Sequence, residues 1–180
     1  MNPLDILRKY YDENSKCYKI LVEHSRKVAD KALEIARKHP EMKLNLPFIE
    51  EAAMLHDIGI LYTDAPDIGC HGTADYVCHG YLGADLLRKE GYPEHALVCE
   101  RHTGTGLSLS DIENRKLPIP RRNMCPVSME EQLVCFADKF FSKTKPEKEK
   151  SIEKIRTGLA RYGTENVSRF DNWYKLFLGE

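Results

Sequence analysis

Apolar positions along most of the chain recur at steps of three and four residues, which is the spacing of an amphipathic helix. From Tyr18 to Ala36 these steps pass through Leu21 and Val28, and His24 falls within the same apolar stripe. No stretch alternates apolar and polar residues in the way that a half-buried strand does. The pattern predicts an all-α fold whose first long helix carries a histidine on its buried face.

Proline, glycine and capping residues predict where the other helices begin and end. Pro47 suits a first helical position and Gly59 a C-terminal cap, so we expect a helix between them with His56 and Asp57 in its last turn. A capping-box pattern at Ser110–Glu113 predicts a short helix. We also expect helices over about 74–89, 94–102, 128–140 and 146–162 and from 164 onward, a surface loop over 61–73 and an excursion over 107–127.

Length and charge narrow the class of protein. A chain of 180 residues is long enough for one domain with a sizeable core, so we expect residues 1–180 to form a single domain. With 27 basic and 28 acidic residues, the chain has no overall charge that favours long nucleic acid or an anionic membrane as its main partner. The apolar runs fall short of the roughly 18 residues that span a bilayer, and we expect a cytoplasmic protein.

The cysteines do not form a familiar metal or redox motif. All six are scattered, without a C-x-x-C pair, and they are expected to be mostly buried thiols in a reducing compartment. Cys70, His71, Cys78 and His79 lie close together in sequence, but their spacing fits no common zinc template. They form the weaker of two candidate metal sites.

The stronger candidate site consists of histidines and aspartates that fall within or at the ends of apolar helices. Burying an unpaired ionisable residue costs several kcal/mol, yet a histidine and an aspartate follow the aliphatic Leu55 directly. Imidazoles and carboxylates together suit one or two first-row transition metals, and a cation would favour neutral imidazole and ionised carboxylate. The candidate ligands are His24, His56, Asp57, His79, His102 and Asp138.

Each of these residues also has an ordinary structural explanation. His24 alone is typical of a hydrogen-bonded core histidine, His102 of a cation that complements a helix dipole, and Asp138 beside Lys139 of a surface ion pair. Taken together, with a histidine at the end of one helix after another, the residues favour the metal site.

The order of these residues resembles the HD superfamily of metal-dependent phosphohydrolases in its HDIG variant. The match runs from about residue 20 to 143, through His24, then L-H-D-I-G-I, then Asp138. The strings H-G-Y-L-G-A-D-L-L and R-H-T-G-T-G, which contain His79 and His102, resemble the six-ligand subset with two metals, such as YqeK-like hydrolases and HD-GYP phosphodiesterases. The resemblance implies a helical domain of about seven to nine helices around a central metal site, with residues 146–180 packed on the same domain.

The resemblance also implies a role for each ligand. It places one metal on His24, His56, Asp57 and Asp138, and a second on His79 and His102, with Asp57 as the bridge. The expected cofactors are two divalent ions of Fe, Mn, Ni, Co or Zn, which would activate a bound water as nucleophile. His56 and Asp57 would therefore be catalytic, together with Lys139, which resembles a lysine often found after the last ligand.

The substrate is less well defined by the sequence. We expect a small phosphate ester, foremost a nucleotide, with Lys139, Arg101, Arg121 and Arg122 as contacts, because arginine binds phosphate through paired hydrogen bonds. About twenty inserted residues between Gly106 and Ser128 distinguish the chain from YqeK-like sequences and leave the substrate open. A di-iron oxygenase and a non-catalytic nucleotide-binding module are the alternatives, and a homodimer also stays open.

Overall fold

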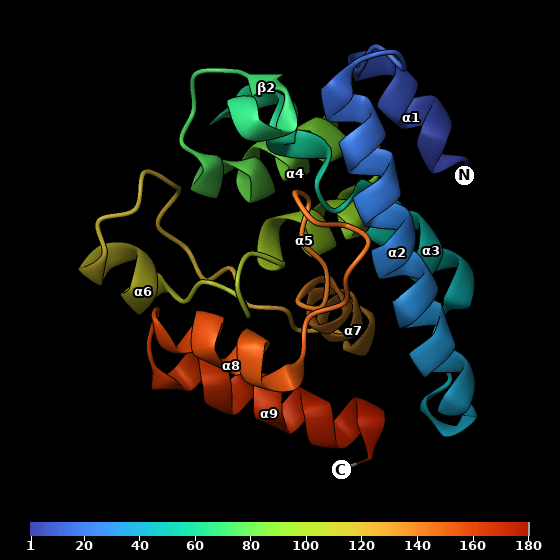
Figure 1. The fold of residues 1–180 in the computed structure, drawn as a ribbon, viewed down its shortest axis with the longest axis vertical. Coiled ribbons are helices and arrows are strands. Elements are labelled where there is room, and N and C mark those ends of the chain that lie inside the picture. Colours follow the sequence, from blue (N-terminus) through green and yellow to red (C-terminus); the bar gives the residue numbers. More distant parts are fainter. Residues whose placement is uncertain (180) are drawn as a thin grey trace.

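The computed structural model describes residues 1–179, which fold mainly into α-helices (Figure 1). The α-helices are α1 (Pro3–Tyr10), α2 (Lys16–Lys38), α3 (Leu46–Leu55), α4 (His79–Lys89), α5 (Pro93–Arg101), α6 (Leu109–Asn114), α7 (Met129–Asp138), α8 (Ile152–Ala160) and α9 (Thr164–Leu178). The two-residue strands β1 (Asp64–Ala65) and β2 (Cys70–His71) pair antiparallel. The predicted all-α class is confirmed. No helix in the described chain is long and apolar enough to span a membrane.

Helix α2 connects the two halves of the apolar core. It begins at Ser15, whose side chain accepts a hydrogen bond from the backbone N–H of Tyr18, and ends before Pro40. Its buried face contributes Leu21 to a cluster with α1, α4 and α5, and Val28 to a cluster with α3, α7, α8 and α9. His24 lies between these two positions, so the candidate site falls where the two apolar clusters meet.

The predicted helix end at Gly59 is wrong, because α3 stops at Leu55. His56 keeps helical backbone angles as the C-cap residue, Asp57 leaves the helix, and a 3₁₀ helix follows over Ile58–Tyr62. A Cβ on Gly59 would lie 2.0 Å from the carbonyl oxygen of His79, so glycine allows a close contact here. That contact places the start of α4 beside Asp57.

The segment 61–73 is more ordered than expected, and the short helix expected within 107–127 is present but begins earlier. The segment 61–73 contains the β1–β2 hairpin, in which Asp64 pairs with His71. The capping box of α6 lies at Ser108 and Asp111, two residues earlier than predicted, because each side chain accepts a hydrogen bond from the other residue's backbone N–H at 3.0 Å.

The C-terminal helices α8 and α9 lie side by side along one edge of the molecule (Figure 1). Helix α8 starts at Ile152, with Ser151 as its N-cap, and not at Pro146 as predicted. The chain over 145–151 is a loop, which the backbone N–H of Lys150 ties to the carbonyl oxygen of Phe140 at 2.8 Å. Phe170 and the apolar face of α9 pack against α7, so the hairpin is part of the same core.

Candidate metal centre

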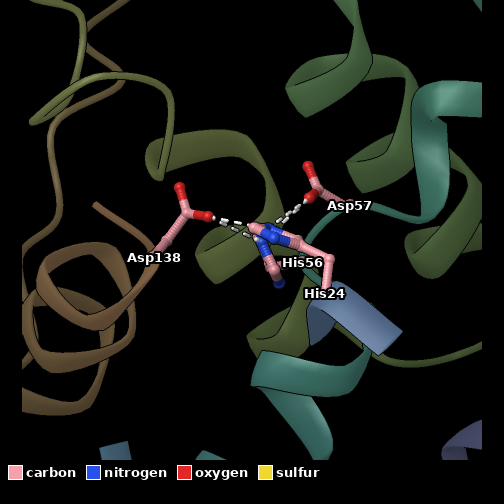
Figure 2. A group of neighbouring side chains, drawn as sticks. All are labelled: His24, His56, Asp57 and Asp138. Atoms are coloured by element: carbon pink, nitrogen blue, oxygen red, sulfur yellow. Dashed lines mark hydrogen bonds and ion pairs between the residues drawn. The ribbon is translucent and has the colours of Figure 1, made fainter. Parts of the chain in front are cut away.

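The structure brings the six predicted ligands together in two groups that share Asp57. Within each group, one ligand atom from every residue lies within 4.8 Å of the others. Figure 2 shows the first group, in which the imidazoles of His24 and His56 lie between the carboxylates of Asp57 and Asp138. The second group consists of Asp57, His79 and His102. The residues come from α2, the end of α3, the start of α4, the end of α5 and the last position of α7.

Asp57 directs its two carboxylate oxygens at two different pairs of histidines. Oδ2 lies 3.2 Å from Nε2 of His24 and 3.0 Å from Nε2 of His56. Oδ1 lies 3.2 Å from Nε2 of His79 and 3.3 Å from Nε2 of His102. The side chain is fully buried, and Oδ2 also lies 2.7 Å from the ammonium of Lys143. Each oxygen of Asp57 therefore faces a different group of candidate ligands.

Three of the histidines are oriented by the same kind of local hydrogen bond. Nδ1 of each lies 2.6 Å from the carbonyl oxygen of the residue three positions earlier, which is Ala53 for His56, Tyr76 for His79 and Cys99 for His102. A carbonyl only accepts hydrogen bonds, so each Nδ1 carries a proton and Nε2 is the nitrogen left to face the site. Histidines at helix ends are therefore held as ligands by their own backbone.

The contact between His79 and His102 shows that the site fits a cation. Their Nε2 atoms lie 3.0 Å apart, and with both Nδ1 atoms protonated, two neutral rings would point lone pairs at each other. A divalent cation bound beside them would accept both lone pairs. Buried atoms of the site without a hydrogen bond agree: within residues 1–179 they include Nδ1 of His24, Nε2 of His56 and Oδ1 of Asp57. The nitrogen and oxygen donors suit first-row divalent metals.

Burial and neighbouring charges shift the pKa values of the site in opposite directions. Burial opposes ionisation of Asp57, but His56 and Lys143 hold the pKa of its carboxyl well below the usual range. Burial also opposes the charge on His56, but Asp57 and Asp138 outweigh it and raise the His56 pKa to about 10. Burial dominates at His102 and lowers its pKa to about 4. The two imidazoles therefore differ, because the neighbouring carboxylates favour the charged form of His56 whereas burial favours the neutral form of His102.

The ammonium groups of two lysines lie close to carboxylates of the site. Nζ of Lys139 lies 2.8 Å from Oδ2 of Asp138 and donates to the carbonyl oxygen of His102 at 3.2 Å. Nζ of Lys143 lies 2.7 Å from Oδ2 of Asp57. The sequence singled out Lys139 but missed Lys143, whose only signal is its place four residues later, at the start of a lysine-rich loop.

A cleft of about 950 Å³ connects the site to solvent. His24 and Asp138 lie at its inner end, and the segment 64–68 and Tyr76 form one wall. Residues 141–144 and α8 form the other wall. The second metal group lies deeper than this opening, because His79 and His102 do not line the cleft and are almost fully buried.

The three predicted arginines do not line this cleft. Arg101 donates to Glu131 at 2.9 Å, and Arg122 is paired with Glu100, so carboxylates outside the site occupy both guanidinium groups. Arg121 is exposed on the excursion. Because these pairings join segments distant in sequence, the adjacency of Arg101 and His102 gave a misleading signal.

The cysteine cluster does not assemble into a metal site among the described residues. Sγ of Cys70 lies 2.6 Å from Sγ of Cys17, and Sγ of Cys78 donates to the carbonyl oxygen of Pro118 at 3.3 Å. His71 is exposed, and His79 belongs to the group with Asp57.

Comparisons with known proteins identify the family and the fold of the chain. The family model described as HD domain matches residues 21–142. The crystal structure of the L. monocytogenes phosphodiesterase PgpH HD domain superposes with a TM-score of 0.55 at 16% identity, over 94% of this chain and 86% of that one, which shows a shared fold.

Three curated relatives are more similar in sequence. An uncharacterized protein of Methanocaldococcus jannaschii is 32% identical over 145 residues, which are 79% of this chain and 75% of that protein. Two tRNA (cytidine(56)-2'-O)-methyltransferases are 26% identical over 98% of the chain (Thermoplasma volcanium) and 28% over 76% (Picrophilus torridus). The matches span only 47% and 38% of those two proteins.

Proposed function

The chain belongs to the HD domain family, and on that premise we propose that it is a metal-dependent phosphohydrolase that acts on a nucleotide or another small phosphate ester. The observation that carries the proposal is Asp57, a buried carboxylate whose oxygens face two separate pairs of imidazole nitrogens. In this proposal His24, His56, Asp57 and Asp138 hold one divalent ion, while His79 and His102 hold a second that shares Asp57. Such ions, when bound, polarise phosphoryl oxygens and lower the pKa of water.

The chain's own residues would bind and orient the phosphate. Lys139 uses two of its three N–H donors on Asp138 and the His102 carbonyl oxygen, which fixes the ammonium at the inner end of the cleft. Lys143 stands beside Asp57 and lines the same cleft. Once cations neutralise Asp57, the ammonium of Lys143 is free to bind a phosphate oxygen.

The names of the relatives support only part of this proposal. The L. monocytogenes protein is a phosphodiesterase, which agrees with phosphoester chemistry, but its likeness to the chain is one of fold. The tRNA methyltransferase activity is not extended to this chain, which matches less than half of each of those proteins. A small substrate is favoured because the cleft is of ligand size and the chain has a net charge of only −1.

The test is turnover of a substrate panel by purified protein loaded in turn with Mn²⁺, Fe²⁺, Co²⁺, Ni²⁺ or Zn²⁺. We expect phosphate or nucleoside monophosphate to be released from a member of the panel, with loss on chelation and recovery with one of the metals. His56→Ala should abolish the release. His71→Ala should not, because His71 is an exposed histidine outside both ligand groups.

Three outcomes would contradict the proposal. A folded, metal-loaded protein without turnover on a broad panel would oppose it directly. Oxygen uptake by the iron-loaded protein without phosphate release would indicate the oxygenase alternative. Tight nucleotide binding without turnover would indicate a non-catalytic binding module.

A further inference from the structure

We propose that Lys150 and Lys154 form a second anion subsite in the cleft, which binds a further phosphate of a substrate with two or more linked phosphates. The inference rests on the proposed function and specifies its substrate class. One phosphate would lie at the inner end, near Lys139 and Lys143, and the next would lie against α8.

The first observation is the imbalance of charge in the cleft. Its lining carries five cations against three carboxylates. The cations are Lys139, Lys143, Lys150, Lys154 and Arg161, and the carboxylates are Asp64, Asp67 and Asp138. Lys139 and Lys143 are paired with Asp138 and Asp57. In the described part of the chain, the charged groups of Lys150, Lys154 and Arg161 have neither an ion pair nor a side-chain hydrogen bond. Three cations therefore face the same cleft without partners.

The second observation is that Lys150 lines the same cleft as Lys139, Lys143 and Lys154 and is affected by their charges. Burial lowers the pKa of the Lys150 ammonium, and the charges of Lys139, Lys154 and Lys143 lower it further against the opposing effect of Asp138. Like charges that act on one partly buried ammonium repel one another. An anion bound among them would relieve this repulsion.

The third observation is that the fold holds the subsite in place. The backbone N–H of Lys150 is bonded to the carbonyl oxygen of Phe140 at 2.8 Å, and buried Ile155 and Leu159 anchor α8 in the core. Lys154 lies in the first turn of α8, where the helix dipole disfavours a cation. An anion in the cleft would be attracted both by Lys154 and by this end of the helix.

The position of the subsite sets it apart from the family core. The family match ends at residue 142, so Lys143, Lys150 and Lys154 all lie beyond it. The cleft volume of about 950 Å³ is also near the top of the range for small-molecule pockets and far exceeds the need of one phosphate group.

The proposed reaction is hydrolysis of a phosphoanhydride. The oxygen of one water forms a bond to the phosphorus at the inner end, and the bridging P–O bond breaks. The departing phosphate, held by Lys150 and Lys154, leaves with the electron pair of that bond, and one proton passes to solvent. Water is the only co-reactant.

The experiment compares the double variant Lys150→Gln/Lys154→Gln with the control Lys145→Gln/Lys148→Gln, which removes two exposed cations of the same loop that do not line the cleft. With metal-loaded enzyme, we expect the double variant to lose about 100-fold in kcat/KM for a nucleoside triphosphate, since each lysine makes a charge-assisted hydrogen bond. The loss for p-nitrophenyl phosphate should stay below about threefold, and the control should match the wild type.

A binding experiment tests this inference independently of the proposed function. By calorimetry, wild-type protein should bind inorganic tripolyphosphate at least about tenfold more tightly than inorganic phosphate, and the double variant should lose that difference. If the wild type hydrolyses monoesters but shows no such preference, the subsite is disproved while the function stands. If nothing is hydrolysed, the function fails and the titration alone decides the subsite. Displacement of tripolyphosphate by a short single-stranded RNA at lower concentration would overturn the inference in favour of an RNA contact.

Discussion

The two ends of the cleft differ in burial and in the way that their charged groups are paired. At the inner end, six ligands from five helical segments are mostly buried, and histidine nitrogens face carboxylate oxygens at about 3 Å. At the outer end, Lys150, Lys154 and Arg161 lie on a loop and on α8 or just after it, without carboxylate partners. In the proposed function the inner end holds cations, and in the further inference the outer end holds anions. A substrate that spans the cleft would therefore be activated at one end and selected at the other.

Asp57→Asn should have the largest effect, because it removes the carboxylate common to both ligand groups. Without this carboxylate neither ion would be held, and we expect activity to fall about 1,000-fold or more, which corresponds to about 4 kcal/mol in activation free energy. Elemental analysis should show that both metals are lost. Asp64→Asn, which changes an exposed carboxylate on the cleft wall, should keep them. An Asp57→Asn protein with two metal equivalents would contradict the bridging role.

His79→Ala tests whether the two ligand groups bind metal independently. Because His79 belongs only to the group with Asp57 and His102, we expect one metal equivalent to remain and activity to fall about 10–100-fold. The measurement is metal content against activity in the same preparation. Loss of both metals would show that the groups do not load separately.

Lys143→Met tests whether Lys143 competes with the metal for Asp57 and binds the phosphate. Its ammonium lies 2.7 Å from Asp57, so its removal should tighten metal binding severalfold and raise KM for the phosphate substrate about tenfold. Metal titration and steady-state kinetics measure the two effects. A metal affinity that falls would indicate that Lys143 supports the ligands and does not compete with the cation.

Two glycine substitutions should give the smallest and most contrasting effects. At the inner end, a Cβ on Gly59 would lie 2.5 Å from the backbone nitrogen of Gly83, so Gly59→Ala should destabilise the fold by about 1–3 kcal/mol. At the outer end, a Cβ on Gly158 meets nothing within 4 Å, so Gly158→Ala in α8 should stabilise it by about 0.5–1 kcal/mol. Denaturant unfolding of both variants checks the pair. Equal effects would mean that the inner end is not tightly packed.

The candidate ligands of the inner end could be predicted from the sequence, whereas the cations of the outer end could not. His24 shares the apolar stripe of α2, and His102 follows a helix that begins at Pro93 and ends just before Gly104, so local patterns located them. Lys150 depends on a loop whose course is fixed by a contact with Phe140, which no local pattern encodes. The predicted start at Pro146 had placed this segment inside a helix.

Errors in the sequence prediction have one common cause. Gly59 resembled a helix cap, but its role comes from the approach of His79. Arg101 and Arg122 resembled phosphate contacts, but Glu131 and Glu100 pair with them. In each case a residue's role was set by a neighbour distant in the chain, which periodicity and spacing do not report.

The shared carboxylate has a consequence for how the protein would be loaded. Any pair of cations held by these groups divides the charge of Asp57, so the first to arrive weakens the field that attracts the second. By thermodynamic linkage this penalty is the same whichever ion binds first. Occupancy would then rise in two unequal steps, and the cellular supply of metal would act on the enzyme as a graded control.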